Sequence, residues 1–498
     1  PFNMSDHIQP SIGLGYLASA IRKEHEVRLV DCIKDDLTID KFMALLKEYN
    51  PEILGLQCYT FDLPFIRQAL KAAKAFNKNI VTVIGGPHSS ALPEATLKAE
   101  KDLDFLFVGE AEKGFPLLVN KIEKLCRGGL PVLHSLSAGG NLPYNGLRSF
   151  NEGGNLPYDE LMKSDVNKTG VTDFSGIPGL GYRDGSAIKI NPNVIQDDLD
   201  GLGLAAWDLI KPQEYPESQH GAFFKQFPIA PIMVTRGCPY PCTFCAGSLV
   251  SGKKIRRRSI DNVLGELKML NNDFGIREFH IIDDNFTMDK EYVKDFLRKL
   301  KALNLGMTWA VPNGVRMDTL DDELLGLMKE TGLYMISLGI ESGSDEVLSE
   351  MRKGITVARI RECVNKIDRA GIDIAGFFIL GFPGETPESI RQTIDFAAEL
   401  PLKRANFFTY LPFPGTESYA KLLASGELKD VDWERFYFTN AAYVPTGITR
   451  KELKSLHRLA FAKFYLRPHI IMYQLKSIQS AKHFGFLARR FMRWIVAN

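Results

Sequence analysis

The chain has 498 residues, of which 45% are hydrophobic and 24% charged, and its formal net charge is +1. These are ordinary globular values, and the length exceeds the size at which one hydrophobic core usually stops growing, so we expect two or three domains. Seven cysteines without a regular spacing argue against a secreted, disulfide-linked scaffold. No signal peptide is visible, and no apolar run reaches the ~18 residues of a membrane span. We therefore expect a cytoplasmic protein.

Residues 1–127 alternate short apolar segments with amphipathic ones, which is typical of a doubly wound, flavodoxin-like parallel sheet. We predict strands at residues 27–30, 53–57, 80–85 and 105–108, and helices at residues 39–47, 65–76 and 115–126. Ligands bind such sheets beyond the carboxyl ends of the strands. Three loops with suitable chemistry lie there: residues 58–60, the Gly-Gly-Pro-His-Ser-Ser loop at 85–90, and the Gly-Glu-Ala-Glu turn at 109–112.

Residues 128–228 are predicted to form a linker and connector. The part from 128 to 172 is rich in Gly, Asn and Ser, and the sequence Gly-Asn-Leu-Pro-Tyr occurs there twice, at 140–144 and 154–158. A long segment of this composition without periodicity is typical of a linker or an insertion. Order is expected to return with a hairpin near residues 181–185.

A second alternating series begins at residue 229. We predict strands at residues 232–235, 279–283, 307–311, 335–339, 374–380 and 405–411, with helices between them. Six units are too few for a closed eight-unit barrel, so residues 229–415 are expected to form a partial (β/α)6 barrel whose chemistry lies at the carboxyl ends of its strands. Residues 416–498 are expected to be mostly helical and basic.

Three cysteines follow the first strand of this series. Cys238, Cys242 and Cys245 have a C-x3-C-x2-C spacing. A four-iron cluster is normally closed by four Cys thiolates, so three ligands would leave one iron open to a substrate or cofactor. The alternative is a structural zinc site, but zinc prefers four protein ligands in paired spacings, and no second pair lies nearby.

This cysteine run closely resembles that of the radical S-adenosylmethionine (SAM) enzymes. Together with a doubly wound domain ahead of the barrel, it is similar to the cobalamin-dependent subclass, and the resemblance covers about residues 1–430. The resemblance implies a 4Fe-4S cluster, SAM and cobalamin as cofactors, and an external electron donor of the flavodoxin or ferredoxin type. In that subclass the cluster and SAM generate a radical that takes hydrogen from the substrate, and cobalamin delivers the methyl group.

The resemblance also implies site residues in the barrel, each at a strand end. Asp283, Asp284 and Asn285 would bind the amino group of SAM, although an N-cap for the helix starting near residue 289 competes with that role. Arg316 would bind the carboxylate, unless it is a surface arginine. The remaining expected contacts, to ribose and adenine, are Phe244, Glu341, Ser342 and Gly381; a packing role for Phe244 is equally open.

In the first domain, the subclass surrounds the corrin with the strand-end loops. The residues implied are Tyr59, Thr60, Gly85, Gly86, His88, Gly109 and Glu110. Small residues suit this role because a large flat cofactor needs backbone close by. The D-x-H-x-x-G pattern of classical cobalamin methyltransferases is absent from residues 5–13, so we do not expect His7 or His88 to be an axial cobalt ligand.

The predicted activity is methylation of an unactivated carbon of a small-molecule, possibly lipid-like, substrate. A cyclisation or rearrangement without net methyl transfer is the main alternative, and methylthiolation of transfer RNA is another, because Cys32, Cys58 and Cys126 could in principle hold a second cluster. We favour ordinary buried thiols for these three. A cobalamin or redox sensor without turnover is disfavoured by the intact series of strand-end loops.

The carboxyl-terminal region differs from the rest of the chain in its net charge. Residues 450–498 contain eleven Lys or Arg and one acid, Glu452, so this region carries +10 and the rest of the chain about −9. Its mixture of basic and bulky apolar residues is typical of a helix lying on an anionic membrane surface. A helix packed on the main domain with its basic face in water fits equally well, and nucleic acid binding is not expected.

Overall fold

The computed structural model describes residues 8–127, 173–217, 224–428, 433, 436–438, 440–485 and 487–489. The chain forms two compact units. The first contains Pro1–Ser19, Arg28–Asp36 and Asp197–Asn498, and the second contains Ala20–Val27 and Leu37–Gln196. The repeated Gly-Asn-Leu-Pro-Tyr sequence and His7 lie outside the described residues. The bounds of the four predicted segments, 1–127, 128–228, 229–415 and 416–498, stay predictions.

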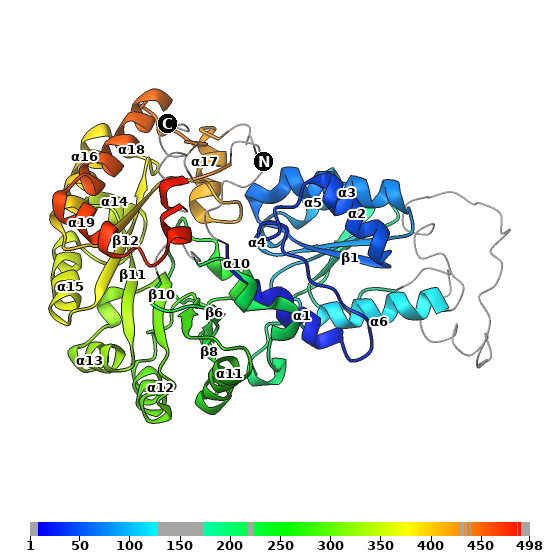
Figure 1. Ribbon diagram of the computed structural model, residues 1–498. Helices are drawn as coiled ribbons and strands as arrows, with labels where there is room; N and C mark the ends of the chain where they lie inside the picture. The colour runs from blue at the N-terminus through cyan, green and yellow to red at the C-terminus, as the bar shows by residue number, and fades with distance from the viewer. Residues whose placement is uncertain are drawn as a thin grey trace. The chain divides into compact units, whose positions relative to one another are not determined.

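The second unit is the doubly wound domain that the sequence predicts (Figure 1). Its five strands lie in chain order across the sheet: β1 (Ile53–Gln57), β2 (Val81–Gly85), β3 (Phe105–Phe107), β4 (Leu180–Asp184) and β5 (Ala187–Ile190). Its helices are α2 (Ile39–Tyr49), α3 (Leu63–Phe76), α4 (Pro87–Ala91), α5 (Pro93–Ala99) and α6 (Gly114–Arg127). The strands β1, β2 and β3 are parallel.

Two separate cores show that helices cover both faces of this sheet. Leu54 and Leu56 of β1 pack with α2 and α3, whereas Val81 and Val83 of β2 pack with α6. Because alternate strand residues point to opposite faces, this division follows from the apolar runs of the strands.

The structure extends this sheet in a way that the sequence did not predict. The hairpin expected near residues 181–185 exists as β4 and β5, and β4 pairs antiparallel with β3, so a segment assigned to the connector completes the sheet. The predicted strand at residues 27–30 is wrong, since these residues have no regular secondary structure. The chain there leads into a turn in which Asp31 accepts hydrogen bonds from the N–H groups of Ile33 and Lys34 and from the hydroxyl of Tyr215.

The first unit is an open barrel of six parallel strands, as predicted. The strands lie in the order β13-β12-β11-β10-β9-β6, and each pairs in parallel with its neighbours. They are β6 (Ile229–Ile232), β9 (Glu278–Ile281), β10 (Thr308–Val315), β11 (Leu333–Glu341), β12 (Asp373–Leu380) and β13 (Arg404–Thr409).

Helices between the strands cover the outside of the barrel (Figure 1). They are α11 (Ile260–Asp273), α12 (Lys290–Leu303), α13 (Asp322–Glu330), α14 (Asp345–Glu350), α15 (Val357–Arg369) and α16 (Pro387–Glu399). Local sequence sets their ends: the side chain of Asp289 caps α12 by accepting from the N–H of Tyr292, and Asn304 ends it in the left-handed conformation. The apolar faces of these helices and the strands form one large core.

The first strand of the barrel ends earlier than predicted. The expected strand at residues 232–235 is observed as β6, which ends at Ile232, followed by β7 (Thr235–Arg236), which pairs antiparallel with β8 (Arg256–Arg257). The chain therefore leaves the barrel sheet before the cysteines. The short helices α1 (Ile12–Ile21) and α9 (Trp207–Ile210) come before β6 in the chain, and α10 (Gly247–Ser251) lies between β7 and β8.

The described carboxyl-terminal region is helical, as predicted. It contains α17 (Glu417–Ser425), α18 (Arg450–Tyr465) and α19 (Pro468–Lys476). Among the residues that the structure describes, none of the helices has both the length and the apolar character that crossing a bilayer requires.

Candidate active site

The three cysteines lie in a loop that a glycine makes possible. Gly237 has φ +96°, and a Cβ atom there would stand 2.3 Å from the carbonyl oxygen of Lys254. The N–H of Cys238 donates to the carbonyl of Gly252 at 3.2 Å. The loop is thus packed against the backbone of residues 252–254 at a position where only glycine fits.

Two carboxylates at the end of β9 hold the start of this loop. Asp283 is buried, and its oxygens accept from the N–H groups of Val234 (2.8 Å) and Thr235 (2.7 Å) and from the Thr235 hydroxyl (2.8 Å). Asp284 accepts from the N–H of Gly237 at 3.1 Å. Burial raises the pKa of Asp283 to about 7, although these hydrogen bonds act in the opposite direction. The N-cap of α12 is Asp289, so the competing capping role is not what these residues do.

The three thiols lie near one another. Cys238 and Cys242 are half-buried and Cys245 is exposed. Partial burial raises the pKa of Cys238 and of Cys242, and the charge of a neighbouring thiolate, Cys245 for the first and Cys238 for the second, acts in the same direction. The described residues contain no group of three Cys, His, Asp or Glu that would hold a single metal ion. A cubane cluster takes its thiolates on separate irons, so it does not require such a group.

An ion pair between Lys353 and Glu341 lies beside the cysteine loop. Their Nζ and Oε1 atoms are 2.7 Å apart, and the two side chains are only 13% and 9% exposed. Glu341 ends β11 with φ +65°, and a Cβ atom on Gly339 would collide with both charged groups, so the glycine makes room for the pair. Burial lowers the pKa of Lys353, but the charges of Glu341 and Cys242 overcome this and raise it. Sequence reasoning missed Lys353, because its only signal is an unspecific Lys-Gly pair after α14.

The guanidinium of Arg316 is largely occupied by the protein. Its Nε and Nη2 atoms donate to the two carboxylate oxygens of Asp318 at 2.9 and 3.0 Å, and further donors reach the carbonyls of Lys353 and Gly354. The group also lies over the ring of Tyr240 at 3.9 Å from its centroid. The planar fork that would grip a carboxylate is therefore engaged by Asp318. The predicted contact of Arg316 with SAM stays a prediction, and the structure gives it no support.

Three more predicted residues have structural partners in the barrel. The ring of Phe244 packs edge-on against Phe382 at 6.4 Å. Ser342 is buried, and its hydroxyl lies 3.1 Å from that of Thr393. Gly381 has φ +79°, and its N–H donates to Glu385 at 2.7 Å. Each of these contacts shapes the rim of the barrel, and a ligand-binding role for the three residues stays a prediction.

Two buried oxygens at the same rim have no hydrogen-bond partner among the described residues. They are Oδ1 of Asn285 and Oε1 of Glu385. Both residues are buried, and burial raises the pKa of Glu385 to about 7. A buried acceptor without a donor costs about 1–3 kcal/mol, so each indicates a place where an N–H or O–H group is expected to bind.

In the second unit, the Gly-Gly-Pro-His loop joins the ends of two strands. Gly86 has φ +112°, and a Cβ atom there would stand 3.0 Å from the carbonyl oxygen of Cys58, which follows β1. The N–H of His88 donates to that carbonyl at 3.1 Å, and the His88 ring lies 3.3 Å from the hydroxyl of Thr60. Burial lowers the pKa of His88 to about 4, so the ring is neutral at pH 7.

The third strand end joins the same loop through Ser90. Its hydroxyl donates to the carbonyl of Gly86 and accepts from the N–H of Gly109, both at 2.8 Å. Glu110 accepts from the N–H of Gln196 at 3.1 Å. The predicted residues Gly85, Gly86, Thr60, His88, Gly109 and Glu110 therefore lie along one edge of the sheet. Tyr59 is 39% exposed and its ring stacks on that of Phe61.

The other cysteines do not gather into a second site among the described residues. Cys32 is half-buried in the first unit, and Cys58 is buried in the second. The side chain of Cys126 lies outside the described residues. Cys363 is buried in the core of the barrel unit.

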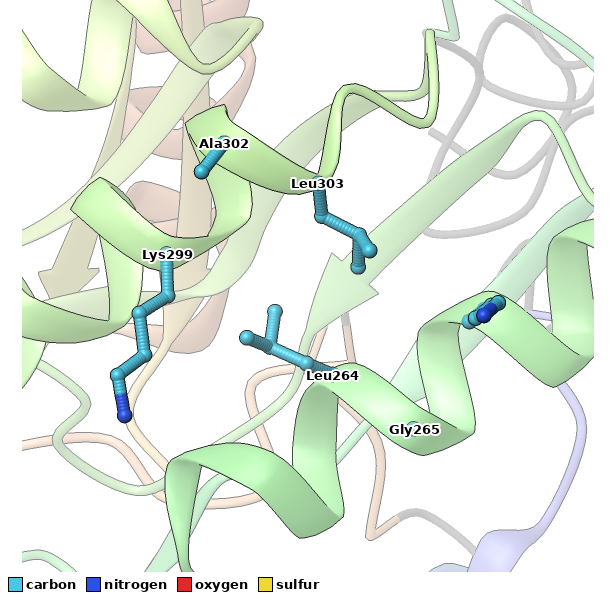
Figure 2. A pocket seen from close by; sticks show the side chains of 6 residues that line it. Leu264, Gly265, Lys299, Ala302 and Leu303 are labelled. Carbon is cyan, nitrogen blue, oxygen red and sulfur yellow. The ribbon is translucent and has the colours of Figure 1, made fainter.

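An open hollow lies between α11 and α12, away from the strand ends. Its lining residues are Leu264, Gly265, Lys268, Lys299, Ala302 and Leu303, and Figure 2 shows Leu264 and Leu303 pointing into the gap between the two helices. None of the predicted site residues is among them. The hollow is part of the outer helical layer, and its lining is apolar apart from Lys268 and Lys299.

Two family models match the chain. Residues 232–397 match the Radical SAM superfamily, and residues 5–119 match the B12 binding domain. The first match contains the three cysteines and the carboxyl ends of the strands β6, β9, β10, β11 and β12, and the second contains the loops at residues 58–60, 85–90 and 109–112.

Named relatives cover most of the chain. An uncharacterized methyltransferase of Pyrococcus horikoshii is 29% identical over 488 residues, which span 98% of this chain and 93% of the relative. Cytidylyl-2-hydroxyethylphosphonate methyltransferase of Streptomyces wedmorensis is 28% identical over 444 residues, 83% of this chain and 78% of the relative. Anaerobic magnesium-protoporphyrin IX monomethyl ester cyclase of Rubrivivax gelatinosus is 22% identical over 471 residues, 93% and 75% of the two chains.

Solved structures share the fold. The radical S-adenosylmethionine methyltransferase TsrM from Kitasatospora setae, solved with cobalamin and a [4Fe-4S] cluster bound, gives a TM-score of 0.63 at 17% identity and covers 91% of this chain and 82% of its own. The cobalamin-dependent S-adenosylmethionine radical enzyme OxsB, with aqua-cobalamin bound, gives 0.59 at 17% identity over 92% of this chain and 59% of its own. At this identity the likeness concerns the fold.

Proposed function

We propose that this chain, which belongs to the radical SAM superfamily and carries a B12-binding domain, methylates an unactivated carbon of a small-molecule substrate. The observation that carries the proposal is the loop of Cys238, Cys242 and Cys245, held at the carboxyl end of an open six-strand barrel by Asp283 and Asp284. Relatives that cover at least 83% of the chain and are named methyltransferases support the reaction type.

The residues present fit an iron-sulfur cluster and SAM. Three thiols within one short loop supply the donors that iron prefers, and they leave one iron without a protein ligand. Asn285 and Glu385 each bring a buried oxygen that lacks a donor, which suits the N–H groups of an ammonium or an amine. Lys353 brings a cation beside Cys242, and we propose that it, rather than Arg316, faces the carboxylate of SAM.

The residues of the second unit fit cobalamin. Gly86, with φ +112° and a Cβ position 3.0 Å from the carbonyl oxygen of Cys58, keeps this strand end free of a side chain, as a large flat cofactor requires. Thr60, Ser90 and Glu110 supply polar atoms along that edge. His88 is buried against Thr60, so we propose that it positions this loop and does not ligate cobalt.

When bound, the cofactors would supply radical generation and methyl transfer, and the chain's own residues would bind and orient them. The bonds from Asp283 and Asp284 fix the backbone from which the thiolates project. The pair of Lys353 and Glu341 keeps a positive and a negative group at the end of β11, where Glu341 is placed to accept from hydroxyls. The packing of Phe244 on Phe382 attaches this side of the loop to the end of β12.

Two other reactions of related proteins compete with methylation. A cyclisation without net methyl transfer is the second candidate, favoured by the similarity to the cyclase across 93% of the chain. We do not propose methylthiolation beside these two reactions, because the similarity to a relative named a putative methylthiotransferase covers only 45% of this chain. An electron donor of the flavodoxin or ferredoxin type belongs to the same proposal, since the cluster needs one electron for each cleavage.

The test is anaerobic reconstitution followed by turnover with methyl-labelled SAM, cobalamin, titanium citrate and a cell extract. We expect about four irons per chain, release of 5'-deoxyadenosine, and label in a product whose mass rises by one methylene. Cys245→Ala is expected to lose the cluster, whereas Cys363→Ala, at a buried thiol of the core, is expected to keep it. About eight irons would revive methylthiolation, and an unlabelled product of altered mass would favour cyclisation.

A further inference from the structure

One helix of the carboxyl-terminal region turns its apolar stripe toward water. In α19, Ile471, Met472 and Leu475 are 42%, 53% and 57% exposed, and Leu466 just before the helix is 67% exposed. Residues spaced by three and four lie on one face of a helix. The apolar stripe of a surface helix normally faces the core, so its exposure here requires an explanation.

The opposite face of α19 is firmly attached to the barrel. Ile470 is fully buried, and the hydroxyl of Tyr473 donates to Asp373 at 2.8 Å. Arg467, just before the helix, donates to the carbonyl of Ala398 at the end of α16. The helix is therefore an ordered element of the barrel unit, and its exposed stripe is a fixed feature of the surface.

The chain that carries the stripe is basic, and the carboxylates that contact it, Asp373 and Glu217, accept from the hydroxyls of Tyr473 and Ser480. Lys476 ends α19, and Lys482 and Arg489 follow it. None of these three forms an ion pair with a residue that the structure describes. Glu452 is the only acid between residues 450 and 498. An apolar stripe beside cations without an ion-pair partner is complementary to a surface whose outer layer is anionic and whose interior is apolar.

We propose that this face docks on the surface of an anionic lipid bilayer, with α19 lying in the plane of the headgroups. Insertion of the stripe would remove its side chains from water, while the lysines and the arginine would meet the lipid phosphates. This proposal does not depend on the reaction proposed above. A second copy of the chain, or another protein, would cover apolar surface as well, but it would not account for the excess of cations.

The place of α19 in the barrel indicates what such docking would do. Asp373, which Tyr473 contacts, is the first residue of β12, so α19 lies near the amino ends of the strands. The cysteine loop lies at their carboxyl ends. The membrane face would thus locate the enzyme without opening its active site to the lipid, and it lends no support to a lipid-like substrate.

The experiment is sedimentation of the full chain with vesicles of phosphatidylcholine, alone or mixed with an equal amount of phosphatidylglycerol. We expect binding to the anionic vesicles, weaker binding at high salt, and little binding to the neutral ones. Met472→Gln/Leu475→Gln is expected to reduce the partition coefficient by roughly tenfold or more. The matched control Leu117→Gln/Leu423→Gln changes two side chains of similar exposure, 49% and 46%, and is expected to bind as the parent does.

Other outcomes overturn the proposal. No binding, or equal loss in both double variants, would remove it. A dimer that the Met472→Gln/Leu475→Gln variant abolishes, with no lipid binding by the parent, would assign the face to a second copy of the chain. If that variant proves unstable by circular dichroism, Lys476→Glu/Lys482→Glu tests the electrostatic half, and unchanged binding to anionic vesicles would then refute the proposal.

Discussion

Replacement of Gly237 by alanine tests whether the cysteine loop is built as described. The residue has φ +96°, which costs an L-residue about 1–3 kcal/mol, and its new Cβ atom would stand 2.3 Å from the carbonyl oxygen of Lys254. Contacts below 3.0 Å do not persist, so the loop and the bend that contains Lys254 must separate by about 0.7 Å. A metal-binding constellation tolerates roughly 0.5 Å, and Cys238 is the next residue. We expect Gly237→Ala to lose the cluster or to bind it with altered geometry.

The assay is iron content and the electron paramagnetic resonance spectrum of the reduced protein after anaerobic reconstitution. Gly247→Ala is the matched control, since it lies in the same region and its Cβ atom would meet only ordinary contacts of 3.5 Å, to Asp284 and Cys245. The control is expected to hold the same iron as the parent. A Gly237→Ala protein with the parent's iron content, spectrum and SAM cleavage rate would refute the reasoning.

Three further predictions follow from buried charges. Lys353→Met is expected to weaken SAM binding by about tenfold or more in equilibrium dialysis, because it removes a charge-assisted contact; unchanged binding would return the role to Arg316. The pKa of Glu385 is raised to about 7 in the folded protein, so its ionisation destabilises the fold as pH rises from about 4.5 through 7. Urea unfolding should show Glu385→Gln gaining stability on the parent by about 2 kcal/mol between pH 5 and 7, and parallel curves would contradict this. Arg258→Met leaves the buried carboxylate of Glu266 without its cationic partner, and we expect it to lower the free energy of unfolding by about 3–5 kcal/mol in the same assay. The double variant Arg258→Met/Glu266→Gln should lose less than the sum of the two single variants, and a loss equal to that sum would argue against the ion pair.

The sequence predicted the fold well where apolar periodicity decides structure. Some strands, such as β2 and β11, are nearly continuous apolar runs that are mostly buried, whereas β9 alternates polar with apolar residues; both patterns are visible in a sequence. Residues 27–30 contain three apolar residues around Arg28, but they are only partly buried and belong to no described sheet. The pairing of β4 with β3 could not be predicted, since a hairpin and its partner strand are separated by a long segment and no local pattern links them.

The candidate site was predictable to the level of the loops. The cysteine spacing and the glycine-rich strand ends indicate chemistry because few structural needs produce them. Individual contacts were not predictable, because they depend on which side chains reach a given point in space. Lys353 binds Glu341, twelve residues away in the chain, and Arg316 binds Asp318, two residues away. No sequence pattern predicts either contact.

The Asp-Asp-Asn segment after β9 shows how one strand end serves two demands. Where β6 leaves the sheet, the N–H groups of Val234 and Thr235 lose their ladder partners, and buried donors must be satisfied. Asp283 meets this need with both of its oxygens, so it has little capacity left for a ligand. Asn285 keeps a buried oxygen without a partner among the described residues. The carboxylate of Asp283 therefore fixes the cysteine loop, and we propose that Asn285, two residues later, is the group of this segment that faces the ligand.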